Sequence, residues 1–178
     1  MIVHDLAVAV LAGGAPRRMG VAKSTVQLPT GGTLGAAMVH LARAIGEHIV
    51  GIGAGDALPD CPCVPDNDRW RGCGPLAGIE AALATGAAHR WLVLPCDMPA
   101  LQVHTLQQLV DVEAPLAALG PGPLPLVIDS ALLPQVREAL EQHALALRDF
   151  VKANAGATLP LDDATQLHNI NTPDDLRG

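Results

Sequence analysis

A short segment near the start of the chain collects the residue types that bind a polyphosphate. Residues 11–23 read LAGGAPRRMGVAK, which places three glycines beside Arg17, Arg18 and Lys23 in a chain with only 11 basic residues. Glycine amides can approach phosphate oxygens closely, and the cations can neutralise phosphate charge. The segment matches neither a G-x-x-x-x-G-K nor a G-x-G-x-x-G loop. It indicates a triphosphate-binding loop, although a solvated basic loop before a helix would share this composition.

A carboxylate stands at the end of another apolar run. Asp97 follows WLVLP (residues 91–95) and Cys96. One carboxylate together with phosphate oxygens and water makes an ordinary Mg²⁺ site, so Asp97 is a candidate metal ligand. An aspartate that caps the next helix is the alternative interpretation.

Three further stretches could contact a ligand. The stretch GPLAG (residues 74–78) surrounds a helix start with glycines, which either allow close packing or let a base meet the backbone. Asp66 precedes this stretch and could accept hydrogen bonds from a base or a sugar. Asn169 and Asn171 are predicted to alternate along a strand and to face one side of it, whereas turn and capping chemistry would also suit them.

The apolar patterns predict the elements that position these residues. The continuous run at residues 6–12 ends in glycines and is typical of a central strand buried on both faces. Further strands are predicted at 48–53 and 91–95, as two short strands around GPGP within 114–128, and near 167–170. Helices are predicted at 33–46, 76–86, 103–112, 131–143 and 147–154, with another helix starting at 172–175.

This alternation predicts an α/β fold: a three-layer, Rossmann-like, mostly parallel sheet with helices on both faces. Ligands of such sheets bind beyond the carboxyl ends of the strands. No linker or repeat divides the chain, so one domain over residues 1–178 is expected.

Composition argues against several classes of function. The 178 residues carry a net charge of −7, and the aromatic residues are Phe150, Trp70 and Trp91 alone. A nucleic-acid partner is therefore not expected. No stretch of about 20 apolar residues predicts a membrane span. The first residues lack the basic start of a secretion signal, so we expect a cytoplasmic protein, with its four cysteines as buried free thiols.

Four motifs taken together resemble a known family. LAGGAPRRMGVAK, CGPLAG, PCDMP and NINTPDDL, in this order, are similar to the molybdenum cofactor guanylyltransferases, the molybdopterin-guanine dinucleotide biosynthesis protein A family. The resemblance spans about Val8 to Leu176 and implies the nucleotide-diphospho-sugar transferase fold. It also implies that Lys23 contacts the phosphates and that Asp97 binds Mg²⁺. The remaining residues that it assigns to the nucleotide are Leu11, Ala12, Gly13, Gly14, Asp66 and Gly78.

The sequence departs from the family near the end of the second predicted strand. An asparagine is expected there, and this chain has Ile52-Gly53-Ala54-Gly55.

The resemblance implies a complete reaction. The terminal phosphate of molybdopterin attacks the α-phosphorus of GTP, which gives the guanine dinucleotide cofactor and pyrophosphate. Lys23, with Arg17 or Arg18, offsets the charge on the pyrophosphate, and Asn169 and Asn171 position the acceptor or the metal.

Molybdoenzymes or other cofactor-synthesis proteins are further candidate partners, and a monomer is expected. The alternatives are a cytidylyltransferase, a sugar-phosphate nucleotidyltransferase, or a carrier of the cofactor that performs no catalysis.

Overall fold

The computed structural model describes residues 4–13, 22–53, 58–171 and 175. The central feature of this part of the chain is a seven-stranded sheet in the order β3-β2-β1-β4-β6-β5-β7. The strands are β1 (His4–Leu11), β2 (Ile49–Ile52), β3 (Cys63–Val64), β4 (Ala88–Pro95), β5 (Leu116–Leu119), β6 (Leu126–Asp129) and β7 (Ala157–Leu159). Strand β6 runs antiparallel to β4 and β5, and every other pair is parallel. The mostly parallel sheet is confirmed.

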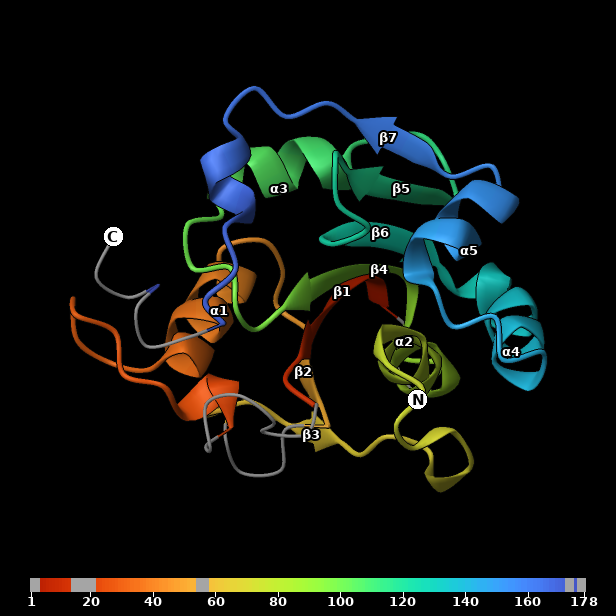
Figure 1. Ribbon diagram of the computed structural model, residues 1–178, viewed down its shortest axis with the longest axis horizontal. Coiled ribbons are helices and arrows are strands. Elements are labelled where there is room, and N and C mark those ends of the chain that lie inside the picture. Colours follow the sequence, from red (N-terminus) through yellow and green to blue (C-terminus); the bar gives the residue numbers. More distant parts are fainter. Residues whose placement is uncertain (1–3, 14–21, 54–57, 172–174, 176–178) are drawn as a thin grey trace.

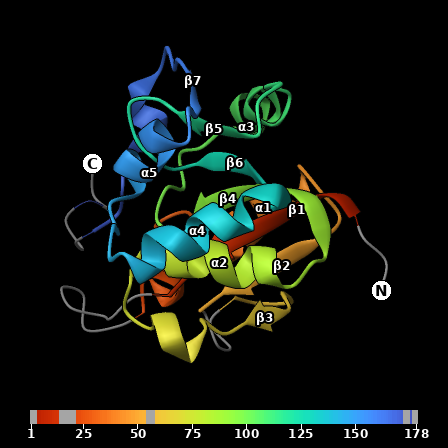
Figure 2. The same ribbon diagram turned by 90° about the vertical axis from the view of Figure 1, so that its right-hand side faces the viewer.

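Helices cover both faces of the sheet, as the alternation predicted. Figure 1 shows α1 (Leu34–Arg43) and α3 (Val103–Val110) on one side, and α2 (Pro75–Ala84), α4 (Leu133–Glu141) and α5 (Leu147–Ala153) on the other. The perpendicular view in Figure 2 shows α2 and α4 side by side across the strands. None of the described helices is long and apolar enough to cross a membrane.

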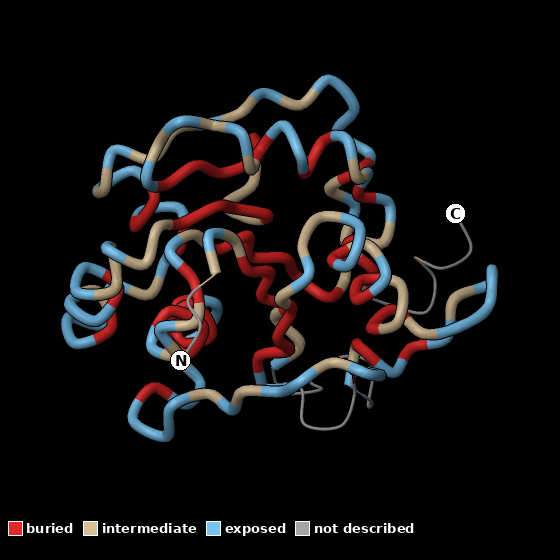
Figure 3. Tube along the Cα trace, turned by 180° about the vertical axis from the view of Figure 1, so that it is seen from behind, coloured by how far each residue is buried: buried red, intermediate tan, exposed pale blue. Residues whose placement is uncertain are grey.

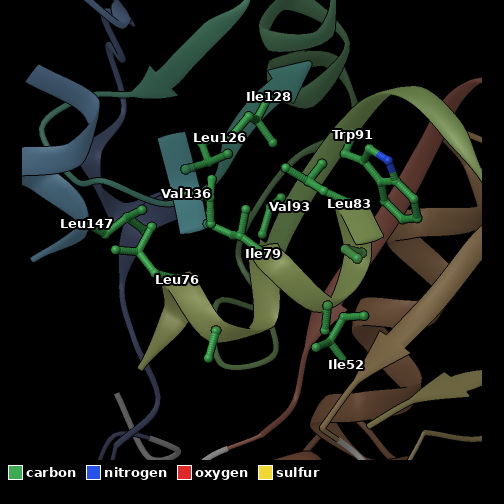
Figure 4. Close-up of a cluster of buried hydrophobic side chains, with 14 of the residues drawn as sticks. Ile52, Leu76, Ile79, Leu83, Trp91, Val93, Leu126, Ile128, Val136 and Leu147 are labelled. Atoms are coloured by element: carbon green, nitrogen blue, oxygen red, sulfur yellow. The ribbon is translucent and has the colours of Figure 1, made fainter. Parts of the chain in front are cut away.

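The core has two halves, separated by the sheet. In β1, Ala7 and Ala9 pack on the face of α2, whereas Val8 and Val10 pack on the face of α1. All four side chains are fully buried, because both faces of this central strand are covered. Figure 3 shows the buried residues running along the strands. In Figure 4 side chains of α2, including Ile79, reach toward those of β4 and β6.

The predicted strand near residues 167–170 was wrong. Residues 168–170 are neither helix nor strand, and residues 164–167 form a short 3-10 helix. The backbone N–H of Ile170 donates to the carbonyl of Asp97 at 2.8 Å, so the segment is held by a loop and not by a neighbouring strand. The last strand is instead β7, which follows α5 and pairs with β5. The predicted helix start at 172–175 lies largely outside the described residues.

Candidate active site

The two strands at the centre of the sheet end side by side. Leu11 of β1 and Pro95 of β4 are register partners, and the backbone N–H of Cys96 donates to the carbonyl of Leu11 at 3.1 Å. The chain leaves β1 toward β2 on one side, and β4 lies on the other side. Such a switch point opens a crevice at the carboxyl edge of an α/β sheet. The loops after β1 and β4 therefore start at the place where a ligand is expected.

Three polar side chains from distant parts of the sequence meet at this edge. The Lys23 ammonium donates to Asp97 Oδ2 at 2.6 Å and to Asn171 Oδ1 at 2.7 Å. Lys23 begins a 3-10 helix that ends at Thr25, and Asp97 follows β4. The Asp97 side chain is 13% exposed and is largely screened from bulk water, whereas the Lys23 side chain is 36% exposed and reaches the surface. The lysine and the aspartate are therefore in direct contact at this edge of the sheet.

Residues 166–171, a C-terminal segment, also contact the loop that carries Asp97. Besides the contact of Ile170 with the Asp97 carbonyl, the buried Gln166 accepts a hydrogen bond through Oε1 from the backbone N–H of Gln102, just before α3. The backbone N–H of Asn171 donates to Asp175 Oδ2 at 2.8 Å. The contacts of Ile170 and Gln166 hold the segment against the loop that carries Asp97.

The prediction that Asn169 and Asn171 lie on a strand and face one side was wrong, because their segment is bonded to the Asp97 loop. Asn171 turns its amide oxygen to Lys23. The Asn169 Oδ1 atom is buried and has no hydrogen-bond partner in the described part of the chain.

The first residues after β1, Ala12 and Gly13, pack closely on Ile52 and Gly53 at the end of β2. The backbone N–H groups of Ala12 and Gly13 both donate to the carbonyl of Ile52, at 3.0 and 3.1 Å. A Cβ atom at Gly53 would lie 2.8 Å from the Gly13 Cα, and Gly53 has a φ of +67°. Only glycine fits there without strain. Gly53 therefore allows the chain after β2 to lie against Gly13.

Asp66 lies beside Gly13 and Gly53. A Cβ atom at Gly13 would be 3.4 Å from Asp66 Oδ2, and one at Gly53 would be 3.3 Å from it. Burial raises the pKa of the Asp66 carboxyl, and the charge of Arg71 opposes that shift. Asp66 is therefore a partly desolvated acceptor next to the predicted nucleotide loop.

Gly78 lies against the ends of β1 and β2. A Cβ atom at this buried position in α2 would come 2.8 Å from Leu11 Cδ2 and 3.2 Å from Ile52 Cγ2. Gly78 thus lets the helix pack against the ends of β1 and β2, in line with the packing interpretation of GPLAG. Its contact with guanosine stays a prediction.

The cysteine next to Asp97 is unsuited to nucleophilic catalysis. Burial, followed by the charge of Asp97, raises the pKa of the Cys96 thiol to about 12. The expectation of four buried thiols was wrong in part: no disulfide joins the cysteines, but Cys61 and Cys73 are half-buried and Cys63 is exposed.

The structure thus brings Lys23, Asp97 and Asn171 together, with the glycine loop and Asp66 at neighbouring strand ends. The predicted Gly14, Arg17 and Arg18 lie outside the described residues. Sequence reasoning missed Gly53 and the backbone contact of Ile170. A close approach of two glycines and a contact across more than 70 residues leave no periodic signal in a sequence.

The donor set suits a hard cation. Asp97 and Asn171 present oxygen atoms, which Mg²⁺ and similar ions prefer, and the Lys23 ammonium lies between them as a stand-in cation. No group of three or more His, Cys, Asp or Glu side chains that could hold an ion occurs among the described residues. A divalent ion at Asp97 would therefore take further ligands from a substrate and from water.

Comparisons with known proteins identify relatives of this chain. Two relatives named probable molybdenum cofactor guanylyltransferase come from Opitutus terrae and Mycobacterium ulcerans. The first is 33% identical over 189 residues, covering 96% of this chain and 92% of the relative. The second is 32% identical over 190 residues, covering 97% of this chain and 92% of the relative.

Solved structures share the fold. Molybdopterin-guanine dinucleotide biosynthesis protein A from Archaeoglobus fulgidus superposes with a TM-score of 0.80 at 23% identity, covering 96% of this chain and 95% of that one. A manganese complex of a Mycobacterium tuberculosis protein has a TM-score of 0.67 at 19% identity, covering 98% and 97%. The family model described as MobA-like NTP transferase domain matches residues 8–158. With this match over most of its length, the chain belongs to the MobA-like NTP transferase domain family.

Proposed function

We propose that this protein transfers GMP from GTP to the terminal phosphate of molybdopterin and releases pyrophosphate. The observation that carries the proposal is the contact of Lys23 with Asp97 at the adjoining ends of β1 and β4. A lysine and a carboxylate at this edge suit phosphates and a divalent ion. Family membership and the names of the full-length relatives support the transferase and its substrates.

The reaction needs no general base. The attacking phosphate of molybdopterin is already anionic near neutral pH, so the protein mainly positions the reactants and neutralises charge. Lys23 stabilises the negative charge that develops on the leaving pyrophosphate. Asp97 would hold Mg²⁺, which would supply further charge neutralisation at the phosphates, and Asn171 holds Lys23 through its amide oxygen.

In this proposal Asp66 recognises the guanine base by accepting hydrogen bonds from it. Guanine presents N–H donors on its Watson–Crick edge, and the Asp66 carboxylate is a half-buried acceptor beside the Gly13 loop. Because the described part of the site has no aromatic ring to stack on a base, hydrogen bonds to a carboxylate and to the backbone carry the recognition. Leu11, Ala12 and Gly13 form the adjoining wall.

The direct test measures pyrophosphate release from the full chain mixed with GTP, Mg²⁺ and molybdopterin. We expect release with GTP and little with CTP, and we expect Asp97→Ala to lower the rate about a hundredfold or more. The matched control is Asp162→Ala, which removes an exposed aspartate outside the site.

Each alternative function predicts a different outcome of this test. Preferential consumption of CTP, or of GTP with a sugar phosphate as acceptor, would indicate a related nucleotidyltransferase. Binding of molybdopterin without pyrophosphate release would indicate a carrier. An unchanged rate in Asp97→Ala would remove Asp97 from the mechanism.

We further propose that residues 1–178 act as one domain and as a monomer in the cytoplasm, with Arg18 assisting Lys23 at the phosphates. Sedimentation of the purified protein tests the monomer, and Arg18→Ala tests the arginine by its rate of pyrophosphate release.

A further inference from the structure

A cation of the protein itself lies against Asp97, the proposed metal ligand. The Lys23 ammonium is 2.6 Å from Asp97 Oδ2 and 2.7 Å from Asn171 Oδ1. A bound Mg²⁺ lies about 2.1 Å from its oxygen ligands and demands near-octahedral geometry. The lysine and a divalent ion therefore cannot bind Asp97 Oδ2 at the same time.

Charge makes this competition stronger. An ammonium and a divalent ion on one carboxylate repel each other, and Asp97 is largely screened from water, which would otherwise weaken that repulsion. The described residues hold no group of three or more His, Cys, Asp or Glu that could bind an ion and compensate. Without a nucleotide, the protein should bind a divalent ion weakly.

A nucleoside triphosphate changes the balance. Its phosphates offer Lys23 an anionic partner in place of Asp97, and they also supply oxygen ligands for the ion. The Lys23 side chain is 36% exposed and can turn toward a ligand. If the nucleotide frees Asp97 for the ion, the ion must favour nucleotide binding to the same degree, since such coupling is reciprocal.

We propose that Lys23 is a displaceable counter-cation of Asp97, held in place by Asn171, so that the protein takes up a divalent ion together with the nucleotide phosphates and not before them. This inference rests on the proposed function and adds the order of binding. Asn171 is a positioning residue for Lys23, because its backbone N–H is fixed by Asp175 while its amide oxygen accepts from the lysine.

The test titrates the nucleotide-free protein with Mn²⁺ and measures free Mn²⁺ by electron paramagnetic resonance. Lys23→Met should bind Mn²⁺ about tenfold more tightly than the wild type, within the usual range of coupling between sites. Lys23→Arg keeps the cation and should bind as weakly as the wild type. The matched control is Lys152→Met at the other lysine of the chain, which is exposed on α5 and should leave Mn²⁺ affinity unchanged.

Two more variants locate the ion and test Asn171. Adding Asp97→Asn to Lys23→Met should abolish the gain, because the ion binds at Asp97. Asn171→Ala should tighten Mn²⁺ binding by a smaller factor, because it loosens the lysine. Weaker binding in Asn171→Ala would make Asn171 an ion ligand and overturn its positioning role. Circular dichroism melts confirm that each variant is folded.

The result that overturns the proposal is distinct from a failure of the transferase. If Lys23→Met and the wild type bind Mn²⁺ equally, or neither binds it, Lys23 is no counter-cation, whatever the protein does with GTP. If the wild type releases no pyrophosphate from GTP, the proposed function fails, while the nucleotide-free titration still reports on the lysine.

Discussion

We predict that the methyl group added by Gly78→Ala will disturb the candidate active site, because Gly78 packs closely on the ends of β1 and β2. In Gly78→Ala the new Cβ would lie 2.8 Å from Leu11 Cδ2 and 3.2 Å from Ile52 Cγ2. Leu11 is only half-buried and its side chain can turn away, whereas Ile52 is 1% exposed and closely packed. The strain therefore falls mainly on Leu11, the last residue of β1.

Two effects of opposite sign determine how Gly78→Ala changes the free energy of unfolding. Replacing glycine by alanine inside a helix stabilises it by about 1 kcal/mol. Overpacking a filled core costs about 1–3 kcal/mol. The net loss is about 1 kcal/mol, which lowers the Tm of a chain of this length by about 2–4 °C.

The effect on ligand binding should exceed the effect on stability. The Leu11 carbonyl accepts from the backbone N–H of Cys96, so a shift of Leu11 moves the neighbour of Asp97. We expect GTP affinity to fall about tenfold, as small misplacements in preorganised sites do. Thermal melts and isothermal titration with GTP measure the two effects separately.

Gly46→Ala is the matched control. A Cβ atom at Gly46 would meet Val8 Cγ2 at 3.4 Å, an ordinary contact. The position precedes β2, at the end of that strand away from the site. The control should keep its GTP affinity and its Tm to within a few degrees. If Gly78→Ala also retained both, close packing at Gly78 would not position the site.

Two further predictions concern titrating groups. Burial raises the pKa of Asp66 above its ordinary value of 3.8, so ionisation of this carboxyl destabilises the fold above the raised pKa and has no such effect below 3.8. Asp66→Asn should therefore raise the Tm at pH 7 and weaken GTP binding, and equal Tm gains at pH 7 and pH 3.5 would contradict this reasoning. Because Cys96 is buried with a pKa of about 12, iodoacetamide at pH 8 should leave it unmodified while the exposed Cys63 reacts, as peptide mass spectrometry would show. Modification of Cys96 at the rate of Cys63 in the folded protein would refute its burial.

The central strand could be predicted from sequence because burial on both faces requires a continuous run of apolar residues. Residues 6–12 are continuously apolar, and β1 is indeed covered on both faces. Residues 167–170 also resemble a strand, but a tertiary hydrogen bond from Ile170 to the Asp97 loop determines their conformation. Strand β7 has three residues, too few for an alternating pattern to show.

The site was predictable to the extent that its residues follow strands. Asp97 comes directly after an apolar run, and the glycine loop ends another, so their convergence follows from parallel strands. The contact of Lys23 with Asn171 joins residues 148 positions apart, and no spacing rule reaches across that separation. Gly53 was unpredicted for a similar reason, since its partner Gly13 belongs to a different loop.

The hydrogen bond between Lys23 and Asn171 can form only late in the synthesis of the chain. The ribosome makes Lys23 early and Asn171 148 residues later, when the strands that build the sheet have already been translated. A nascent chain can thus pair its strands before it can anchor this lysine. Polypeptides that end ahead of residue 166 would lack Asn171, so their Lys23 would lose this hydrogen bond.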